Sequence, residues 1–148
     1  MKIMFVCYAN TSRSAMAEAI FKEMVGDDVE VSSSGIMART GKKSSALTVE
    51  VCRSHGIDLS GHTATNFRSS DIGEMDLVLT LEEFYTEKVR IHYPDLEICT
   101  IKQFIGEYPP DIGDPVGGDF KVYDACFCEI YRCLEKVKAV LVEKSLIQ

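Results

Sequence analysis

Two segments of the chain place a cysteine and an arginine six positions apart, Cys7 with Arg13 and Cys126 with Arg132. A thiolate is a strong nucleophile, and a guanidinium can bind two oxygens of one anion through its planar fork. Together these groups suit the transfer of a phosphoryl group to sulfur. Because the spacing occurs twice, spacing alone does not decide which pair carries chemistry.

The second pair lies in a segment whose apolar residues recur at three- and four-residue steps, as in an amphipathic helix. These residues are Val122, Cys126, Ile130, Cys133, Val137 and Leu141. The pattern predicts that Cys126 is a core residue of a long helix, where a cysteine packs as a small, inert hydrophobe. The segment from Cys126 to Arg132 also has no glycine, asparagine or serine that would turn the backbone.

The first pair lies between an apolar run at residues 2–6 and a helical pattern at residues 14–24. Asn10 and its neighbours Thr11 and Ser12 favour a loop, and asparagine tolerates left-handed backbone conformations. Such a loop can point successive N–H groups inward at the start of a helix, which creates a site for an oxyanion such as phosphate. The positive potential of these N–H groups also favours the thiolate form of Cys7.

Two flanking side chains complete this predicted loop. Arg13 can present its fork to two anion oxygens. Ser14 can either cap the helix or donate a hydrogen bond to the thiolate. The first segment therefore predicts a nucleophile beneath a bound phosphoryl group.

Phosphoryl transfer also needs an acid for the leaving group. Asp114, followed by Pro115, lies in a long loop predicted at residues 104–119, with Asp111 as a nearby competitor. The loop follows the fourth predicted strand, so it reaches the same edge of the sheet as the cysteine loop, where ligands bind in open α/β folds. The alternative is that Asp114 is only a turn residue before proline.

The elements that must position these residues alternate along the chain. Strands are predicted at residues 2–6, 29–32, 76–80 and 96–101, and helices at 14–24, 45–55, 81–90 and 120–143. This alternation predicts an α/β fold in which a parallel sheet has helices on both faces. The 148 residues are enough for one domain, spanning 1–148.

Composition limits the classes of partner that we expect for this protein. The net charge is −7 with no basic tract, which argues against nucleic acid. No apolar run is long enough for a membrane span or a signal peptide, so we expect a cytoplasmic protein that binds no membrane. The six cysteines are scattered without a C-x-x-C pair, and the three histidines are not grouped with them. We therefore expect reduced thiols, no metal and no cofactor.

The chain resembles the low-molecular-weight protein tyrosine phosphatase family over nearly its whole length. The resemblance rests on residues 6–18 around Cys7 and Arg13, on Asp114-Pro115, and on Gly117-Gly118 before the last helix. It implies a single three-layer domain with a four-stranded parallel sheet. It also implies that Cys7 forms a phosphocysteine intermediate, that Arg13 and loop amides hold the phosphoryl group, and that Asp114 protonates the leaving atom and then activates water. A phosphorylated protein would be the substrate, and inorganic phosphate or other oxyanions would bind the loop.

The resemblance assigns further residues to the phosphate-binding loop and its support: Tyr8, Ala9, Asn10, Thr11, Ser12, Ser14, Ser33 and His62. In the family a polar network shapes the loop, and Asn10, Ser14, Ser33 and His62 occupy the matching positions. From the residues alone, Ser33 reads as a strand-end serine and His62 as a loop histidine.

Several positions depart from the family pattern. Ala9 replaces the usual glycine, which predicts strain in the loop, and Ala15 replaces a common proline. Ser12 replaces a second cysteine that protects the nucleophile in many members, so we expect Cys7 to overoxidise more readily. Val116 stands where many tyrosine-specific members have an aromatic residue, which removes one wall for a phenyl ring.

Thr11 bears on the substrate. Many tyrosine-directed members have a bulky aliphatic residue there, whereas a threonine resembles the protein arginine phosphatase branch of the family. The alternative is that Thr11 only satisfies a loop amide. Phosphotyrosine in protein is our first expectation and phosphoarginine the alternative.

Two rival functions use the same scaffold. Thioredoxin-coupled arsenate reductases resemble the fold and the first loop, but they need two further cysteines after the third strand, and residues 81–95 contain none. A non-catalytic phosphopeptide-binding module would lack the nucleophile, the arginine or the acid, and Cys7, Arg13 and Asp114 are all present.

Overall fold

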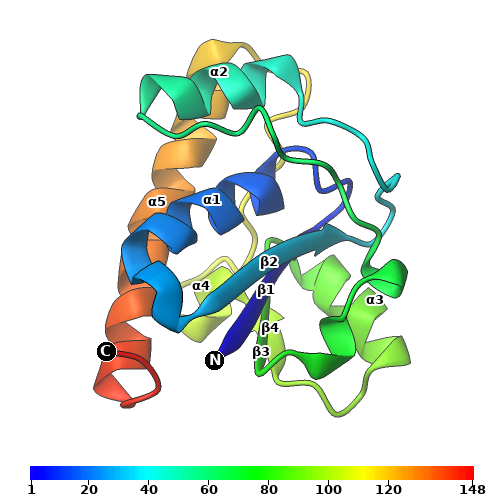
Figure 1. The fold of residues 1–148 in the computed structure, drawn as a ribbon, viewed down its shortest axis with the longest axis vertical. Coiled ribbons are helices and arrows are strands. Elements are labelled where there is room, and N and C mark those ends of the chain that lie inside the picture. The colour runs from blue at the N-terminus through cyan, green and yellow to red at the C-terminus, as the bar shows by residue number, and fades with distance from the viewer.

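The computed structural model describes all of residues 1–148, and strands and helices alternate along it (Figure 1). The strands are β1 (Lys2–Cys7), β2 (Glu30–Gly35), β3 (Leu77–Thr80) and β4 (Ile98–Thr100). The helices are α1 (Arg13–Val25), α2 (Ala46–Ser54), α3 (Glu83–His92), α4 (Ile101–Phe104) and α5 (Phe120–Glu143). Three short 3-10 turns lie at Gly26–Asp28, Phe67–Ser69 and Ile72–Glu74.

The four strands form one parallel sheet in the order β2-β1-β3-β4. The predicted fold class, a four-stranded parallel sheet between helices, is therefore confirmed. The chain runs outward from β1 in both directions, so the strand order reverses beside β1. In open α/β sheets a ligand crevice forms at such a reversal, outside the carboxyl ends of the strands. Cys7 is the last residue of β1 and lies at this edge.

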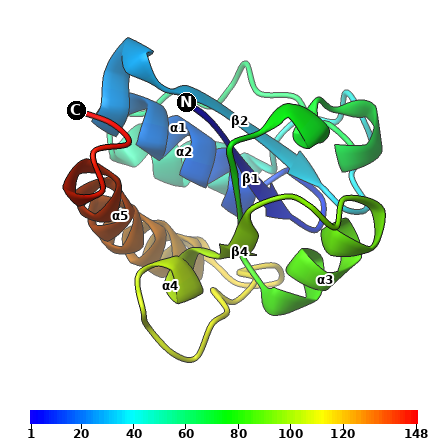
Figure 2. The same ribbon diagram turned by 90° about the horizontal axis from the view of Figure 1, so that it is seen from below.

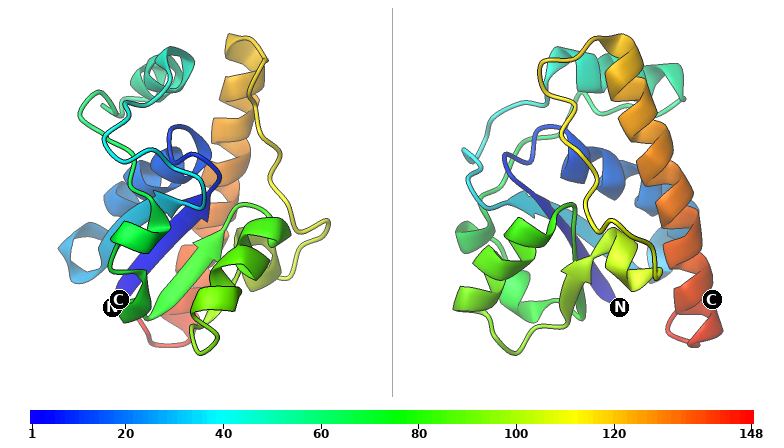
Figure 3. Two further views of the ribbon diagram at one scale, coloured as in Figure 1. Left: turned by 90° about the vertical axis from the view of Figure 1, so that its right-hand side faces the viewer. Right: turned by 180° about the vertical axis from the view of Figure 1, so that it is seen from behind.

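Helices cover both faces of the sheet (Figure 2). Helices α1 and α5 pack on one face, with α2 stacked against α5, whereas α3 and the segment containing Phe67–Ser69 and Ile72–Glu74 lie over the other. Helix α5 runs along the molecule and lies in front of α1 in the view from behind (Figure 3, right). None of the helices combines the length and the apolar character that a membrane crossing requires.

The core stripe predicted for α5 is confirmed at five of its six positions, including Cys126 and Ile130. Val122 is the exception, with 46% of its surface exposed. It lies in the first turn of α5, against Gly118 of the preceding loop rather than against the sheet. The periodicity therefore holds only where the helix has another layer beneath it.

Some element boundaries differ from those predicted. Strand β2 continues to Gly35, beyond the predicted end at residue 32, so Ser33 lies inside the strand. Strand β4 is shorter than predicted, because Thr100 ends it and caps α4 through a reciprocal pair of hydrogen bonds with Gln103. Residues 101–104, predicted as a strand end and the start of a loop, are therefore helical. Helix α3 begins at Glu83 rather than Leu81.

Candidate active site

The loop between β1 and α1 turns sharply after Cys7. Asn10 adopts a left-handed conformation with φ of 57°, which asparagine tolerates better than most residues. The loop also lies directly against the end of β2. A Cβ atom on Gly35 would lie 2.6 Å from the Tyr8 carbonyl oxygen and 2.9 Å from the Asn10 nitrogen, so glycine is required there.

The strain predicted at Ala9 is absent from this loop. Asn10 and Ser145 are the only non-glycine residues of the chain with positive φ. Ala9 therefore sits in a conformation open to any L-residue, and the prediction was wrong. The left-handed turn falls one residue later, at Asn10, where the side chain is suited to it.

The Cys7 thiol is buried and receives two polar contacts. Its sulfur lies 2.8 Å from the Ser14 hydroxyl, and the Asn10 backbone N–H donates to it over 3.3 Å. Ser14 thus contacts the sulfur and does not cap α1, since the helix begins at Arg13 and Ser12 precedes it.

Asn10 connects the loop to its surroundings through all its polar groups. The side-chain NH2 donates to Ser14 Oγ (2.7 Å) and to Ser33 Oγ (2.9 Å). Its side-chain oxygen accepts from the backbone N–H of Thr65 (2.9 Å), and its carbonyl oxygen lies 2.9 Å from His62 Nε2. The structure therefore brings Ser33 and His62, distant in sequence, onto the loop beside Ser14.

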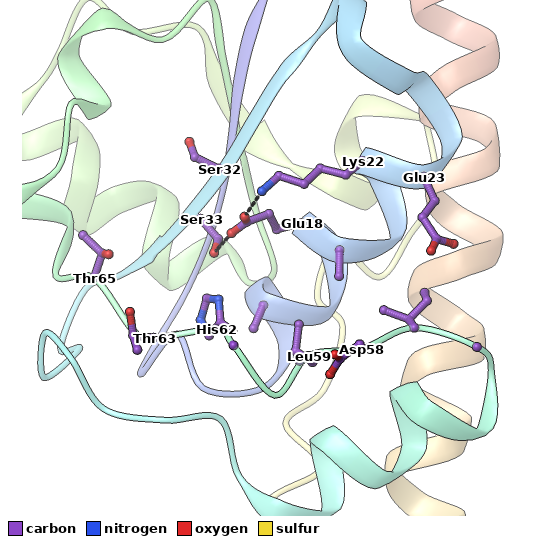
Figure 4. A pocket seen from close by; sticks show the side chains of 15 residues that line it. Glu18, Lys22, Glu23, Ser32, Ser33, Asp58, Leu59, His62, Thr63 and Thr65 are labelled. Carbon is purple, nitrogen blue, oxygen red and sulfur yellow. Dashed lines mark hydrogen bonds and ion pairs between the residues drawn. The ribbon is translucent and has the colours of Figure 1, made fainter.

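Glu18 extends this network and was missed from the sequence. Ser33 Oγ donates to Glu18 Oε1 (2.5 Å), and the other carboxylate oxygen accepts from Lys22 (2.6 Å). Figure 4 shows Glu18 between Lys22 and Ser33, with His62 on the same side of the pocket beside α1. A continuous chain of hydrogen bonds thus runs from the surface at Lys22 to the sulfur of Cys7.

Arg13 is held by groups that follow β3 and by the loop before α5, with only 2% of its surface exposed. Its Nη1 donates to Glu82 Oε2 (2.5 Å) and to the Ile112 carbonyl oxygen (2.7 Å), while Nη2 donates to the Tyr85 hydroxyl (2.7 Å). Tyr85 in turn donates to Glu82 (2.9 Å). The guanidinium is therefore fixed along one edge before any anion arrives.

Burial disfavours the charged form of Arg13, but the hydrogen bond to Glu82 and the neighbouring charges raise its pKa well above the ordinary value. Burial also raises the pKa of Tyr85 well above its ordinary range, with Arg13 acting in the opposite direction. Tyr85 is thus a neutral hydrogen-bonding partner for a permanent cation. Sequence reasoning missed Glu82 and Tyr85, although both follow a parallel strand at the ligand-binding edge.

The loop before α5 is tied to the end of β3. The Ile112 N–H donates to the Leu81 carbonyl oxygen (2.8 Å), and Asp111 Oδ1 accepts from the backbone N–H of Glu83 (2.8 Å). Asp111 is thus engaged at the start of α3. Asp114, by contrast, lies with Oδ2 3.5 Å from Arg13 Nη2, and its side chain is 43% exposed. Its Oδ1 accepts from the Val116 N–H (3.0 Å).

A pocket of about 420 Å³ joins the loop after β1 to the loop before α5. It is lined by Cys7, Tyr8, Ala9, Thr11, Ser12, Arg13, Lys42, Ser45, Asp114, Val116 and Tyr123. The nucleophilic thiol, the guanidinium and a carboxylate thus face one space. Lys42 and Tyr123 were missed; they come from segments whose sequence has no local signal for a site. Tyr123 supplies an aromatic wall of the pocket, whereas Val116 supplies an aliphatic one.

Two loop side chains differ in what they contact. Ser12 Oγ lies 2.8 Å from Thr48 Oγ1 and so links the loop to α2. The hydroxyl of Thr11 makes no hydrogen bond to a loop amide, and this residue lines the pocket. The alternative in which Thr11 only satisfies a loop amide therefore has no contact to support it.

All six cysteines are free. Burial raises the pKa of the five thiols other than Cys7. Burial raises the pKa of Cys126 to about 12, and that of Cys52 likewise. A potential metal-ligand group occurs on the surface, where atoms of His55, Asp124 and Cys128 lie within 4.8 Å of one another. No spacing in the sequence predicts this grouping, which joins the end of α2 to α5. It is not part of the pocket around Cys7.

The chain belongs to the family of low molecular weight phosphotyrosine protein phosphatases, whose family model matches residues 2–146. It is 33% identical to the low molecular weight protein-tyrosine-phosphatase PtpB of Staphylococcus haemolyticus, covering 93% of this chain and 98% of that protein. It is 30% identical to a protein-arginine-phosphatase of Geobacillus stearothermophilus, covering 92% and 93% respectively. Homologues of both names are hydrolases, so the resemblance inferred from the sequence is confirmed.

A solved structure agrees with this assignment. The YwlE arginine phosphatase, as a cysteine-to-serine mutant with a phosphorylated active-site serine, superposes with a TM-score of 0.89 at 28% identity, covering 95% of each chain. The family therefore contains proteins named for two different phosphorylated residues.

Proposed function

We propose that this protein hydrolyses phosphotyrosine in proteins through a phosphocysteine intermediate at Cys7. The observation that carries the proposal is the single pocket that gathers the Cys7 thiol, the Arg13 guanidinium and the Asp114 carboxylate. Each of the three meets one requirement of phosphoryl transfer: a nucleophile, an anion clamp and a proton donor. Residues 1–148 act together as one phosphatase domain, which the span of the family match supports.

In the first step the Cys7 thiolate attacks phosphorus as the bond to the phenolic oxygen breaks. Protonated Asp114 gives its proton to that oxygen, so the tyrosine leaves neutral. Ser14 and the Asn10 N–H, already at the sulfur, stabilise the thiolate before attack. Arg13 binds phosphoryl oxygens with its Nε and the free side of Nη2, since Glu82 and Ile112 occupy Nη1.

In the second step a water molecule attacks phosphorus and the bond to sulfur breaks. The Asp114 carboxylate takes a proton from that water, which releases inorganic phosphate and restores the thiolate. No electrons are exchanged, and no metal or cofactor enters the scheme. The phosphorylated active-site serine of the mutant arginine phosphatase supports a covalent intermediate at the matching position.

The loop support is part of the proposal. Asn10, Ser33 and His62 hold the loop in the shape that aims its N–H groups at the anion, with Ser12 and Tyr8 at its rim. These are positioning residues, since none of them needs to exchange a proton with the substrate. A reducing compartment such as the cytoplasm keeps Cys7 reduced, as this reaction requires.

Phosphoarginine in protein is the second candidate substrate. Thr11 lines the pocket with a hydroxyl that has no partner in the protein, and the pocket lacks an aromatic residue at Val116. A free hydroxyl can accept a hydrogen bond from a phosphoguanidinium N–H, which a phenolic ester does not offer. The arginine phosphatases among the relatives support this alternative.

Two experiments test these proposals. Turnover of p-nitrophenyl phosphate that is abolished in Cys7→Ser indicates an enzyme, whereas phosphopeptide binding without turnover indicates a binding module.

Paired kcat/KM values for a phosphotyrosine and a phosphoarginine peptide then decide the substrate. A preference for phosphotyrosine supports our proposal. A preference for phosphoarginine that Thr11→Ile reverses would assign the specificity to Thr11. Arsenate reduction with thioredoxin would revive the reductase alternative.

A further inference from the structure

A second hollow of about 620 Å³ lies beside the catalytic pocket, between α3 and the segments that follow β2 and precede Phe67–Ser69. Figure 1 shows these segments side by side on the right of the molecule. We call it the α3 groove and define it by Tyr8, Met37, Arg68, Phe84, Lys88 and Ile91. Its volume lies within the range of about 300–1,000 Å³ typical of ligand sites.

The α3 groove gathers apolar side chains that the fold leaves uncovered. Ile91 is 70% exposed, Met37 61% and Phe84 55%. On α3 the core-facing residues are Tyr85, Thr86 and Val89, so Phe84 and Ile91 form a separate outward stripe. A contiguous apolar surface of this kind on a soluble domain marks an interaction site more often than chance exposure.

The charged side chains that line the groove are all basic. Arg68 and Lys88 line it, with no aspartate or glutamate, although the chain carries a net charge of −7. Neither residue forms an ion pair with the rest of the chain, whereas Lys22, Lys102 and Lys136 do. The Lys88 ammonium instead lies 5.1 Å from the centre of the Phe84 ring. The groove therefore complements a ligand that is both apolar and acidic.

The groove adjoins the catalytic pocket, because Tyr8 lines both. A chain that places a phosphorylated side chain over Cys7 can leave the pocket past Tyr8 and enter the groove. We propose that the α3 groove binds the polypeptide segment beside the phosphorylated residue of the substrate, and that it selects segments with an apolar and an acidic side chain. This inference rests on the proposed phosphatase function and names the class of substrate.

The test compares two phosphotyrosine peptides. One carries leucine and aspartate within four residues on both sides of the phosphotyrosine, and the other carries serine and asparagine at those positions. Each kcat/KM is divided by that for p-nitrophenyl phosphate, which is too small to reach the groove. For the unmodified protein we expect the ratio to be about tenfold higher for the leucine–aspartate peptide.

The groove variants should remove this preference. We expect the double variant Phe84→Ser, Ile91→Ser to lower the ratio about tenfold for the leucine–aspartate peptide and little for the other. Leu146→Ser is the matched control, since Leu146 is 52% exposed but lies outside the groove. An equal loss for both peptides would contradict the proposal.

A charge swap provides the sharper test, because a merely structural role would not produce it. Lys88→Glu should lower the ratio for the aspartate peptide about threefold and raise it for a peptide with lysine in place of aspartate. Lys138→Glu, the same change on α5, should alter neither ratio. The effect should shrink at high salt, since exposed charges are screened.

Failure of the groove and failure of the function are distinguishable. If the protein turns over p-nitrophenyl phosphate through Cys7 but shows no peptide preference, or keeps it in the groove variants, the groove proposal is overturned and the phosphatase stands. If no phosphate ester is turned over, both are overturned. Binding of the two peptides to Cys7→Ser should show the same preference, and equal affinities there would also refute the groove.

Discussion

Cys7 with Arg13 and Cys126 with Arg132 have the same spacing, yet the fold gives them opposite properties. Cys7 ends a strand, accepts from the Asn10 N–H and contacts the Ser14 hydroxyl, whereas Cys126 lies in the core within α5, where burial raises its pKa to about 12. Arg13 is buried with three partners, whereas Arg132 is exposed and pairs with Glu107. The same residue types thus acquire chemistry only where a strand, a loop and a helix start meet.

The largest expected effect separates the two cysteines. Cys7→Ser should lower kcat for p-nitrophenyl phosphate by more than about a thousandfold, because a serine hydroxyl is a far weaker nucleophile at neutral pH. Cys126→Ala should leave kcat close to the unmodified value and instead lower the free energy of unfolding by about 1 kcal/mol through a small cavity. Steady-state kinetics and urea unfolding measure the two. Comparable activity losses in both variants would break the comparison.

The two arginines should differ next most. Arg13→Ala should lower kcat/KM by about a hundredfold or more, because the phosphoryl oxygens lose their clamp in the transition state. Arg13→Lys should recover little, since an ammonium cannot form the planar fork. Arg132→Ala removes an exposed ion pair with Glu107 and should leave the free energy of unfolding almost unchanged. An active Arg13→Ala variant would show that loop amides alone hold the anion.

The two aspartates of the loop before α5 form a third contrast. Asp114→Asn should lower kcat/KM, which reports cleavage of the ester, by about a hundredfold for phenyl phosphate and far less for p-nitrophenyl phosphate, whose leaving group needs no proton. Asp111→Asn, which perturbs only the start of α3, should show no dependence on the leaving group. A dependence that appears in Asp111→Asn instead would move the acid role to Asp111.

The smallest effect concerns the partner of Arg13. Tyr85→Phe removes one hydroxyl contact to the guanidinium, and we expect kcat/KM to fall about three- to tenfold. The loss should also weaken inhibition by inorganic phosphate, since the clamp is less well oriented. Tyr131→Phe is the control, because Tyr131 lies exposed on α5. Unchanged phosphate inhibition in Tyr85→Phe would mean that Glu82 and Ile112 suffice to orient Arg13.

Much of the site could be predicted because its signals are local or topological. The apolar run before Cys7 and the helical pattern after Arg13 identify the loop, and the parallel alternation places Asp114 at the same edge. These features depend on residues adjacent in sequence and on the order of strands and helices, and both can be inferred from the sequence pattern. The core position of Cys126 was likewise predictable from its helical period.

Other parts depended on contacts between distant residues. Glu82 and Tyr85 lie about seventy positions from Arg13, and their role follows only from the packing of α3 against the sheet. Glu18 reaches the loop through Ser33, which the longer β2 carries beneath Asn10. The prediction of strain at Ala9 was wrong because a family pattern does not show which residue adopts the left-handed conformation.

The central claim is that Cys7, and not any other cysteine, carries the phosphoryl group during turnover. The most direct measurement is acid-quenched peptide mass spectrometry of Asp114→Asn turning over p-nitrophenyl phosphate, since loss of the base slows hydrolysis of the intermediate. We predict one added phosphoryl group on the peptide containing Cys7, and none in the Cys7→Ala background. A phosphoryl group on another residue, or turnover that persists in Cys7→Ala, would contradict the account.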